Sequence, residues 1–287
     1  MNVNKLTVTD ADYPEVLREI FDPPQVIYWA GQPLDSWLNQ PKVAIVGSRK
    51  FSPYGKHVTE RLVTDLARAG VVIISGLAYG IDITAHKTAL ATGGTAVAVL
   101  PSSLDQIYPA AHFSIASQIT KQGSLITEYP PGSGIAYKSN FIARNRIISG
   151  LADAVLIPEA ALKSGSLHTA RFALEQGKTV MAVPGNITSP GSEGCNNLIK
   201  SGALPATSVE DIFFALKIQP SKAEARIKFT GTEIETAIYK LIMDGVKDQE
   251  DLITATAIDS PTLSSTLTML EISGHIRPTG GGSWVIA

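Results

Sequence analysis

Cysteine is almost absent from this sequence of 287 residues. The single cysteine, Cys195, excludes a disulfide framework within the chain and an all-cysteine metal cage. Apolar runs are short as well. None approaches the roughly 18 residues that a membrane helix requires, and the first residues lack the apolar core of a signal peptide. We therefore expect a soluble protein of the reducing cytoplasm.

Motifs for catalysis and for cofactors are lacking too. The five histidines show no His-Glu-x-x-His spacing, and no Gly-x-Ser-x-Gly elbow offers a serine nucleophile. The glycines after the first predicted strand do not follow Gly-x-Gly-x-x-Gly, which argues against a dinucleotide site. Gly55-Lys56 resembles the end of a P-loop but is followed by His57, so ATP hydrolysis is not indicated. The sequence predicts no catalytic residue, no metal and no cofactor.

What is present is a largely apolar chain with an uneven charge. Hydrophobic residues make up 44% and the formal net charge is -2, which excludes a disordered tail. Residues 41–150 nevertheless hold eleven Lys and Arg against five Asp and Glu, while the flanking stretches are acidic in sum. A basic region in an acidic chain indicates a local anionic partner, with an ordinary solvated surface as the alternative.

Apolar, β-branched runs recur from residue 42 onward. They lie at Val43–Val46, Val71–Ile74, Thr95–Leu100, Ser124–Thr127, Ala154–Ile157 and Thr179–Val183, and most are separated by stretches with helical spacing. Strands that are apolar on both faces and alternate with helices are typical of a parallel sheet covered on both sides. We predict a doubly wound, mostly parallel α/β domain over residues 41–217. Its ligand should lie beyond the carboxyl ends of the strands.

The two ends of the chain are expected to serve this domain. Residues 1–40 are too few to hold a core of their own, so we expect a lead-in packed on the next domain. Residues 218–231, with a proline and mixed charges, indicate a linker. Residues 232–287 contain three helical patterns and then a hairpin with three glycines at its turn. This order predicts a C-terminal winged-helix domain.

Three strand-end loops could bind phosphate. Gly47-Ser48-Arg49 follows the first strand of the domain, Ser75-Gly76 follows the second, and Ser164-Gly165-Ser166 opens a later helix. Glycines and hydroxyls at a helix N-terminus favour phosphate through backbone N–H groups and the helix dipole. Each loop alone could be a tight turn. Their convergence on one sheet edge would make a phosphate-binding groove.

A cluster of cations around an aromatic residue gives the sharper signal. In the predicted helix over 138–146, Phe141, Arg144 and Asn145 fall on one face, and Lys138 joins them one turn earlier. Single-stranded nucleic acid is bound by such sets, because a base stacks on the ring while cations follow the phosphates. The alternatives are a core phenylalanine and structural ion pairs made by Arg144 or Arg146.

The chain also resembles a known family, the DNA-processing protein A family. The matching stretches run in consistent order: Val43–Arg49, Ser75–His86, Tyr108-Pro109, Phe141–Arg146, Glu159, Ser164–Ala170 and Val183–Gly185. The resemblance implies an extended Rossmann-type domain that binds and protects single-stranded DNA. It further implies loading of a RecA-type recombinase during natural transformation, and a homodimer formed through the Rossmann domain.

Applied to this sequence, the resemblance assigns roles to several groups chosen above. It implies that Arg49 and Lys138 hold phosphates, that Phe141 stacks on a base, and that Arg144 and the Ser164–Ser166 loop line the pocket. Two positions depart from the family pattern. Ser102-Ser103 stand where glycines are common, and Ile142 replaces a usual proline.

Two further readings concern the C-terminal domain and a rival activity. No Lys or Arg occurs from residue 248 to 276, so this region should repel duplex DNA and bind a protein or pack on its own chain. The rival is a nucleotide-processing phosphoribohydrolase with a Gly-Gly-x-Gly-Thr-x-x-Glu signature. Aligning Thr169 with its threonine places Phe172 where the acid–base glutamate should stand.

Overall fold

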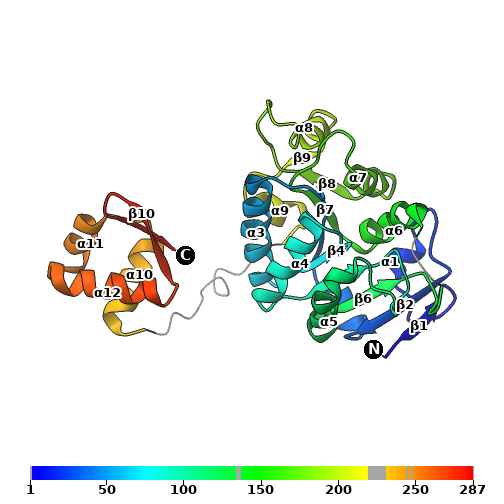
Figure 1. Ribbon diagram of the computed structural model, residues 1–287, viewed down its shortest axis with the longest axis horizontal. Helices are drawn as coiled ribbons and strands as arrows, with labels where there is room; N and C mark the ends of the chain where they lie inside the picture. The colour runs from blue at the N-terminus through cyan, green and yellow to red at the C-terminus, as the bar shows by residue number, and fades with distance from the viewer. Residues whose placement is uncertain (1, 134–136, 219–230, 244, 247, 287) are drawn as a thin grey trace. The chain divides into compact units, whose positions relative to one another are not determined.

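The computed structural model describes residues 2–133, 137–218, 231–243, 245–246 and 248–286. The chain divides into two compact units, residues 1–221 and residues 222–287 (Figure 1). Most of the stretch expected as a linker, residues 219–230, lies outside the described residues. None of the helices in the described ranges is long and apolar enough to cross a bilayer.

The first unit is built on one nine-stranded sheet. Its strands are β1 (Asn4–Thr7), β2 (Val26–Gly31), β3 (Lys42–Ile45), β4 (Val72–Ser75), β5 (Ala96–Val99), β6 (Ser124–Thr127), β7 (Ala154–Ile157), β8 (Thr179–Ala182) and β9 (Leu204–Pro205). They lie in the order β1-β2-β6-β5-β4-β3-β7-β8-β9. Only the β1–β2 and β2–β6 pairs are antiparallel. The expected doubly wound, mostly parallel sheet is confirmed.

Helices cover both faces because the central strands are buried on both. Every residue of β3, β4, β5, β6 and β7 is buried. One core lies under α3 (Pro53–Arg68), α4 (Ile81–Ala91), α5 (Phe113–Gln122) and α9 (Val209–Ala215). The other lies under α1 (Glu15–Arg18), α2 (Asp35–Leu38), α6 (Lys138–Leu151), α7 (Ser166–Glu175) and α8 (Glu193–Lys200).

The first forty residues are part of this sheet. They contribute the antiparallel strands β1 and β2 at one edge, which is more than a packed lead-in. Helix α1 packs on α6, and Trp37 of α2 is buried with its indole N–H donating to Ser124 Oγ at 3.0 Å. The segment is too short to form a core alone, and its apolar side chains pack instead into the core of the larger unit.

The second unit is small and mainly helical. It holds α10 (Glu233–Met243), α11 (Gln249–Thr256) and α12 (Ser260–Ile272), followed by the antiparallel pair β10 (Ile276–Gly280) and β11 (Ser283–Ile286). Its core includes Ile238, Leu252, Leu263 and Leu267. The order of elements is the one that the sequence pattern suggests; assignment to the winged-helix class stays a prediction.

Arg146 joins α6 to two other parts of the first unit. Its guanidinium makes two hydrogen bonds to the Glu128 carboxylate, at 2.8 and 2.7 Å, and its Nε lies 2.9 Å from Asp22 Oδ2. Only 10% of the side chain is exposed. The sequence left open whether Arg146 belongs to the cation cluster or to a structural ion pair, and the structure shows the ion pair.

We expect Arg146→Ala to lower the free energy of unfolding by about 3 kcal/mol, because it leaves the half-buried Glu128 carboxylate without its partner. Urea denaturation measures the effect. Arg171→Ala is the matched control, because it removes an exposed pair with Glu175 at 3.2 Å and should cost less than about 1 kcal/mol. Equal costs for the two variants would contradict the assigned role of Arg146.

Candidate nucleic-acid interface

The candidate site lies where the strand order reverses. From β3 the chain proceeds through β4, β5 and β6 on one side of the sheet, and then through β7, β8 and β9 on the other. The loops that follow β3 and β7 therefore meet at the carboxyl edge, where Ser48 N donates to Glu159 O at 2.8 Å. Such a switch point is where open α/β sheets bind ligands.

Arg49 and Phe141 come together at this edge. The guanidinium carbon of exposed Arg49 lies 5.4 Å from the centroid of the Phe141 ring. Arg49 belongs to the loop after β3, whereas Phe141 belongs to α6. The ring is half-buried and meets Tyr108 edge-on, with centroids 5.2 Å apart and an interplanar angle of 77°. The ring is thus neither sealed in the interior nor alone.

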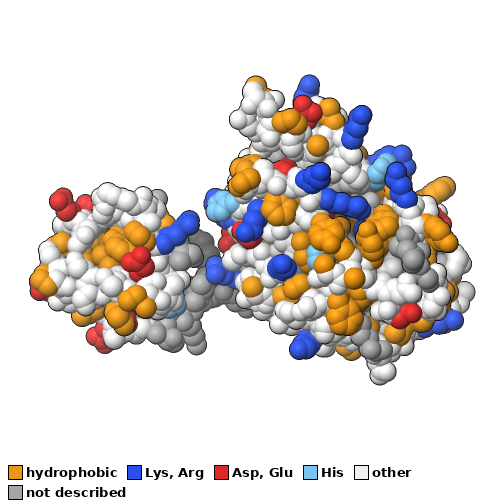
Figure 2. All heavy atoms as spheres, viewed as in Figure 1, with side chains coloured by type: hydrophobic (Ala, Val, Ile, Leu, Met, Phe, Trp, Pro, Cys, Tyr) orange, Lys and Arg blue, Asp and Glu red, His pale blue; other side chains and the backbone are white. Residues whose placement is uncertain are grey.

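A second exposed cation stands at the start of the helix that carries Phe141. Lys138 is the first residue of α6, one turn before Phe141, and it is exposed beside Tyr137, which is 75% exposed. The first turn of α6 has no acidic residue and no side-chain cap, so its N-terminus adds positive potential. Figure 2 shows Lys and Arg side chains gathered among hydrophobic ones on the larger unit.

Arg144 occupies a different place from the one that its spacing suggests. The side chain is buried, with 3% of the residue exposed, and its Nη1 donates to Gly76 O at 2.7 Å and to Val99 O. Burial lowers the pKa of Arg144 to about 10, which still leaves it charged at neutral pH. Arg144 therefore ties the ends of β4 and β5 together, and its Nη1 is used within the protein.

Internal carboxyl groups take some of the backbone donors around the first two loops. The Glu159 carboxylate accepts from Ser52 N at 3.0 Å and from Ser52 Oγ, at the start of α3. Asp82 Oδ2 accepts from Gly76 N at 3.1 Å, and the backbone N–H of Gly47 also bonds this carboxyl. The protein itself therefore uses part of the backbone N–H groups around these two loops.

Burial raises the pKa of the Asp82 carboxyl, while Arg144 and the backbone N–H groups around it act in the opposite direction. Gly47 is buried, and Ser48 Oγ donates to Lys50 O at 2.7 Å. In this loop the exposed side chains of Arg49 and Lys50 are left to meet a ligand.

The third loop is exposed at Gly165. Ser164, Gly165 and Ser166 precede or begin α7, whose first turn has no acidic residue and no capping side chain. Gly165 is exposed, and a Cβ built on it would meet nothing within 4 Å. Asn145 Nδ2 donates to Gly165 O at 3.5 Å, which links α6 to this loop. Ser166 is buried and its hydroxyl pairs with Ser164 Oγ at 2.8 Å, so the phosphate-binding role of this loop stays a prediction.

Aromatic side chains extend the edge beyond Phe141. Tyr79 is 51% exposed and stacks edge-on against His112 at 4.7 Å, and Tyr108 is 46% exposed. Sequence reasoning assigned no role to either tyrosine. The Tyr108-Pro109 pair was a usable signal, because it follows a predicted strand and so belongs to the functional edge.

The two departures from the family pattern do not disturb the ring and its cation. Ser102 and Ser103 are 3% and 0% exposed at the end of β5, so they form part of the support and not of the surface. Ile142 is 40% exposed on α6, and Phe141 keeps its place beside Arg49. Within the described residues, no group of three or more His, Cys, Asp or Glu could hold a metal ion.

Comparison with known proteins finds relatives over most of the chain. The model of the family described as DNA recombination-mediator protein A matches residues 4–217. The chain is 39% identical to Protein Smf of Escherichia coli over 280 residues, which is 94% of this chain and 74% of that protein. It is 42% identical to DNA processing protein DprA of Streptococcus pneumoniae over 206 residues, which is 72% of each chain.

Two solved structures are similar to the chain. The X-ray structure of DNA processing protein A from Streptococcus pneumoniae has a TM-score of 0.70 at 40% identity, and the match covers 75% of this chain and 74% of that one. A structure of DNA processing protein A from Helicobacter pylori, described for its single-stranded DNA binding mode, has a TM-score of 0.67 at 34% identity. That match covers 76% of this chain and 96% of the other.

Gly76 should tolerate no side chain, because a Cβ there would lie 2.7 Å from Arg144 Cζ. We expect Gly76→Ala to lower the free energy of unfolding by about 1 to 3 kcal/mol as the guanidinium is displaced. Gly165→Ala is the control, since it adds the same methyl group in open space. Urea denaturation compares the two, and an unchanged midpoint for Gly76→Ala would contradict the packing described here.

Proposed function

The chain belongs to the DNA recombination-mediator protein A family, and on that premise we propose that it binds single-stranded DNA at the carboxyl edge of its sheet without breaking any bond. The observation that carries this proposal is the Arg49–Phe141 pair beside Tyr108. A half-buried ring can stack on a base of any identity, while the cation beside it meets the neighbouring phosphate. The single-stranded DNA described for the Helicobacter pylori relative supports the same ligand.

The filled backbone donors favour a polynucleotide over a small nucleotide. Glu159 accepts from Ser52 N and Asp82 accepts from Gly76 N, so the phosphate contacts that we propose are Arg49, Lys138 and the Ser164–Ser166 loop. Contacts of this kind are individually weak. Their sum over several nucleotides gives affinity that is independent of sequence.

We propose that the protein protects the strand rather than hydrolysing it. The competing phosphoribohydrolase needs a glutamate at the position of Phe172, whose ring lies 5.6 Å from the guanidinium carbon of Arg171 on α7. Turnover of nucleoside monophosphates distinguishes the two functions. Base release that is abolished by Arg49→Ala would favour the enzyme.

Further proposals concern the partners. We propose that the bound strand is delivered to a RecA-type recombinase in natural transformation, and that the protein acts as a homodimer through its Rossmann-like unit. The exposed residues of α12 include Ser264, Ser265, Thr268 and Met269 but no cation, so we propose a protein contact and no duplex binding for the second unit. Sedimentation of the full chain, alone and with recombinase, tests these partners.

We predict that Arg49→Ala and Lys138→Ala each weaken the binding of every oligonucleotide sequence. Each loss of a phosphate contact should reduce the slope of log K against log salt concentration by about 0.7. A salt titration with single-stranded oligonucleotides measures both quantities. Arg68→Ala is the matched control, because Arg68 lies exposed at the opposite end of α3 from the site. Slopes equal to that of the control would exclude these two cations from the site.

Phe141→Ala is expected to weaken binding by roughly 5- to 150-fold, since base stacking contributes about 1 to 3 kcal/mol. The salt slope should stay close to that of the unmodified protein, because no charge is removed. Phe172→Ala serves as control, as it removes a ring beside an arginine elsewhere on the same unit. Unchanged affinity for Phe141→Ala, with an intact thermal melt, would contradict the stacking role.

A further inference from the structure

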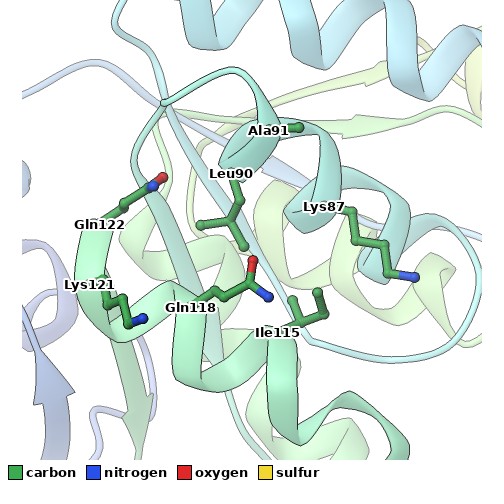
Figure 3. Close-up of a pocket in the computed structure, with 7 residues that line it drawn as sticks. All are labelled: Lys87, Leu90, Ala91, Ile115, Gln118, Lys121 and Gln122. Atoms are coloured by element: carbon green, nitrogen blue, oxygen red, sulfur yellow. The ribbon is translucent and has the colours of Figure 1, made fainter.

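A hollow of about 470 Å³ lies between α4 and α5, outside the site described above. Leu90 and Ile115 contribute apolar side chains to its lining, and Gln118 and Gln122 contribute amides. In Figure 3 the side chains of Gln118 and Leu90 point toward one another between the helices, with Lys87 and Lys121 at opposite ends. The hollow thus combines apolar contact area with amide groups and a cation at each end.

The charge of this surface is of one sign. The only carboxyl on α4 is the buried Asp82, and α5 has none. In the stretch of chain that connects α4 to α5, Asp105 is the single acidic residue, and its carboxylate accepts a hydrogen bond from Gly132 N at 3.2 Å. Among the described residues, neither Lys87 nor Lys121 has a carboxylate within salt-bridge distance, and both are exposed. An anionic partner is the one that this surface fits.

The hollow lies toward the C-terminal ends of two helices that start at the edge carrying the candidate site. Helices α4 and α5 both begin at that edge, where Tyr79 and His112 stand one residue before Gly80 and Phe113 and their rings meet at 4.7 Å. Lys87 lies about 9 Å along the axis of α4 from its first residue, and Lys121 about 12 Å along α5. Phe113, which is 58% exposed, offers a further ring at this entrance.

We propose that the hollow between α4 and α5 is a second subsite for single-stranded DNA, which receives the strand after it passes the Tyr79–His112 pair. The inference rests on the proposed function and deepens it. Lys87 and Lys121 neutralise phosphates, the amides of Gln118 and Gln122 meet polar edges of bases or sugars, and the apolar floor contacts their faces. Long strands then bind more tightly than short ones because they occupy both subsites.

The test compares the full chain with a Lys87→Ala/Lys121→Ala double variant on oligothymidylates of about 4 to 16 nucleotides, the span of known single-strand site sizes. Lys5→Ala/Lys200→Ala is the control, because it removes the same charge from exposed positions outside α4 and α5. We expect the double variant to bind the shortest strands as the unmodified protein does. On long strands its salt slope should be lower by about 1.4, corresponding to two lost phosphate contacts.

The possible results separate this inference from the proposed function. Binding equal to that of the control at every length would overturn the second subsite and leave the first intact. An equal loss at every length would also overturn it, because the lysines would then belong to the first subsite. A changed oligomeric state of the double variant, measured by sedimentation, would assign this face to another protein chain. Absence of oligonucleotide binding by the unmodified protein would refute the proposed function itself.

Discussion

The buried guanidinium of Arg144 is the interaction on which the functional edge depends. A buried charge is tolerated only where hydrogen bonds and an opposite charge compensate the loss of water. Here the carbonyls of Gly76 and Val99 accept from it, and the nearby Asp82 carboxyl favours its charged form. Because those carbonyls end β4 and β5, one side chain fixes the loops that carry Tyr79 and Tyr108. The lack of a side chain at Gly76 is a condition of this arrangement.

Two carboxyl groups then decide what kind of ligand the edge can bind. A helix N-terminus with free N–H groups is a ready anion site, and in a typical nucleotide-binding sheet it receives a phosphate. Here Glu159 occupies the start of α3, and Asp82 takes donors in the next loop. The proposed function therefore assigns recognition to side chains at this edge of the sheet. Such side chains can follow a flexible polyanion but do not enclose a single phosphate.

Sequence patterns predicted the parallel sheet and the meeting of Arg49 with Phe141, because parallel strands place their following loops at one edge. They misplaced Arg144, since helical spacing shows which residues share a face but not which strand ends cover it. Spacing within one helix does not predict the role of Tyr108, because its ring reaches Phe141 from another loop. Strands β1 and β2 were read as a lead-in, because their core is supplied by residues more than eighty positions away.

The Arg49–Phe141 contact also couples the two main parts of the proposed site. In the free protein the cation lies over the ring, an interaction worth about 0.5 to 1 kcal/mol at an exposed position. A base that stacks on the ring must share this face with the guanidinium or displace it toward the phosphate. Removing either residue therefore changes the ground state of the other, so single-variant losses are not independent and their sum does not equal the binding energy of the pair.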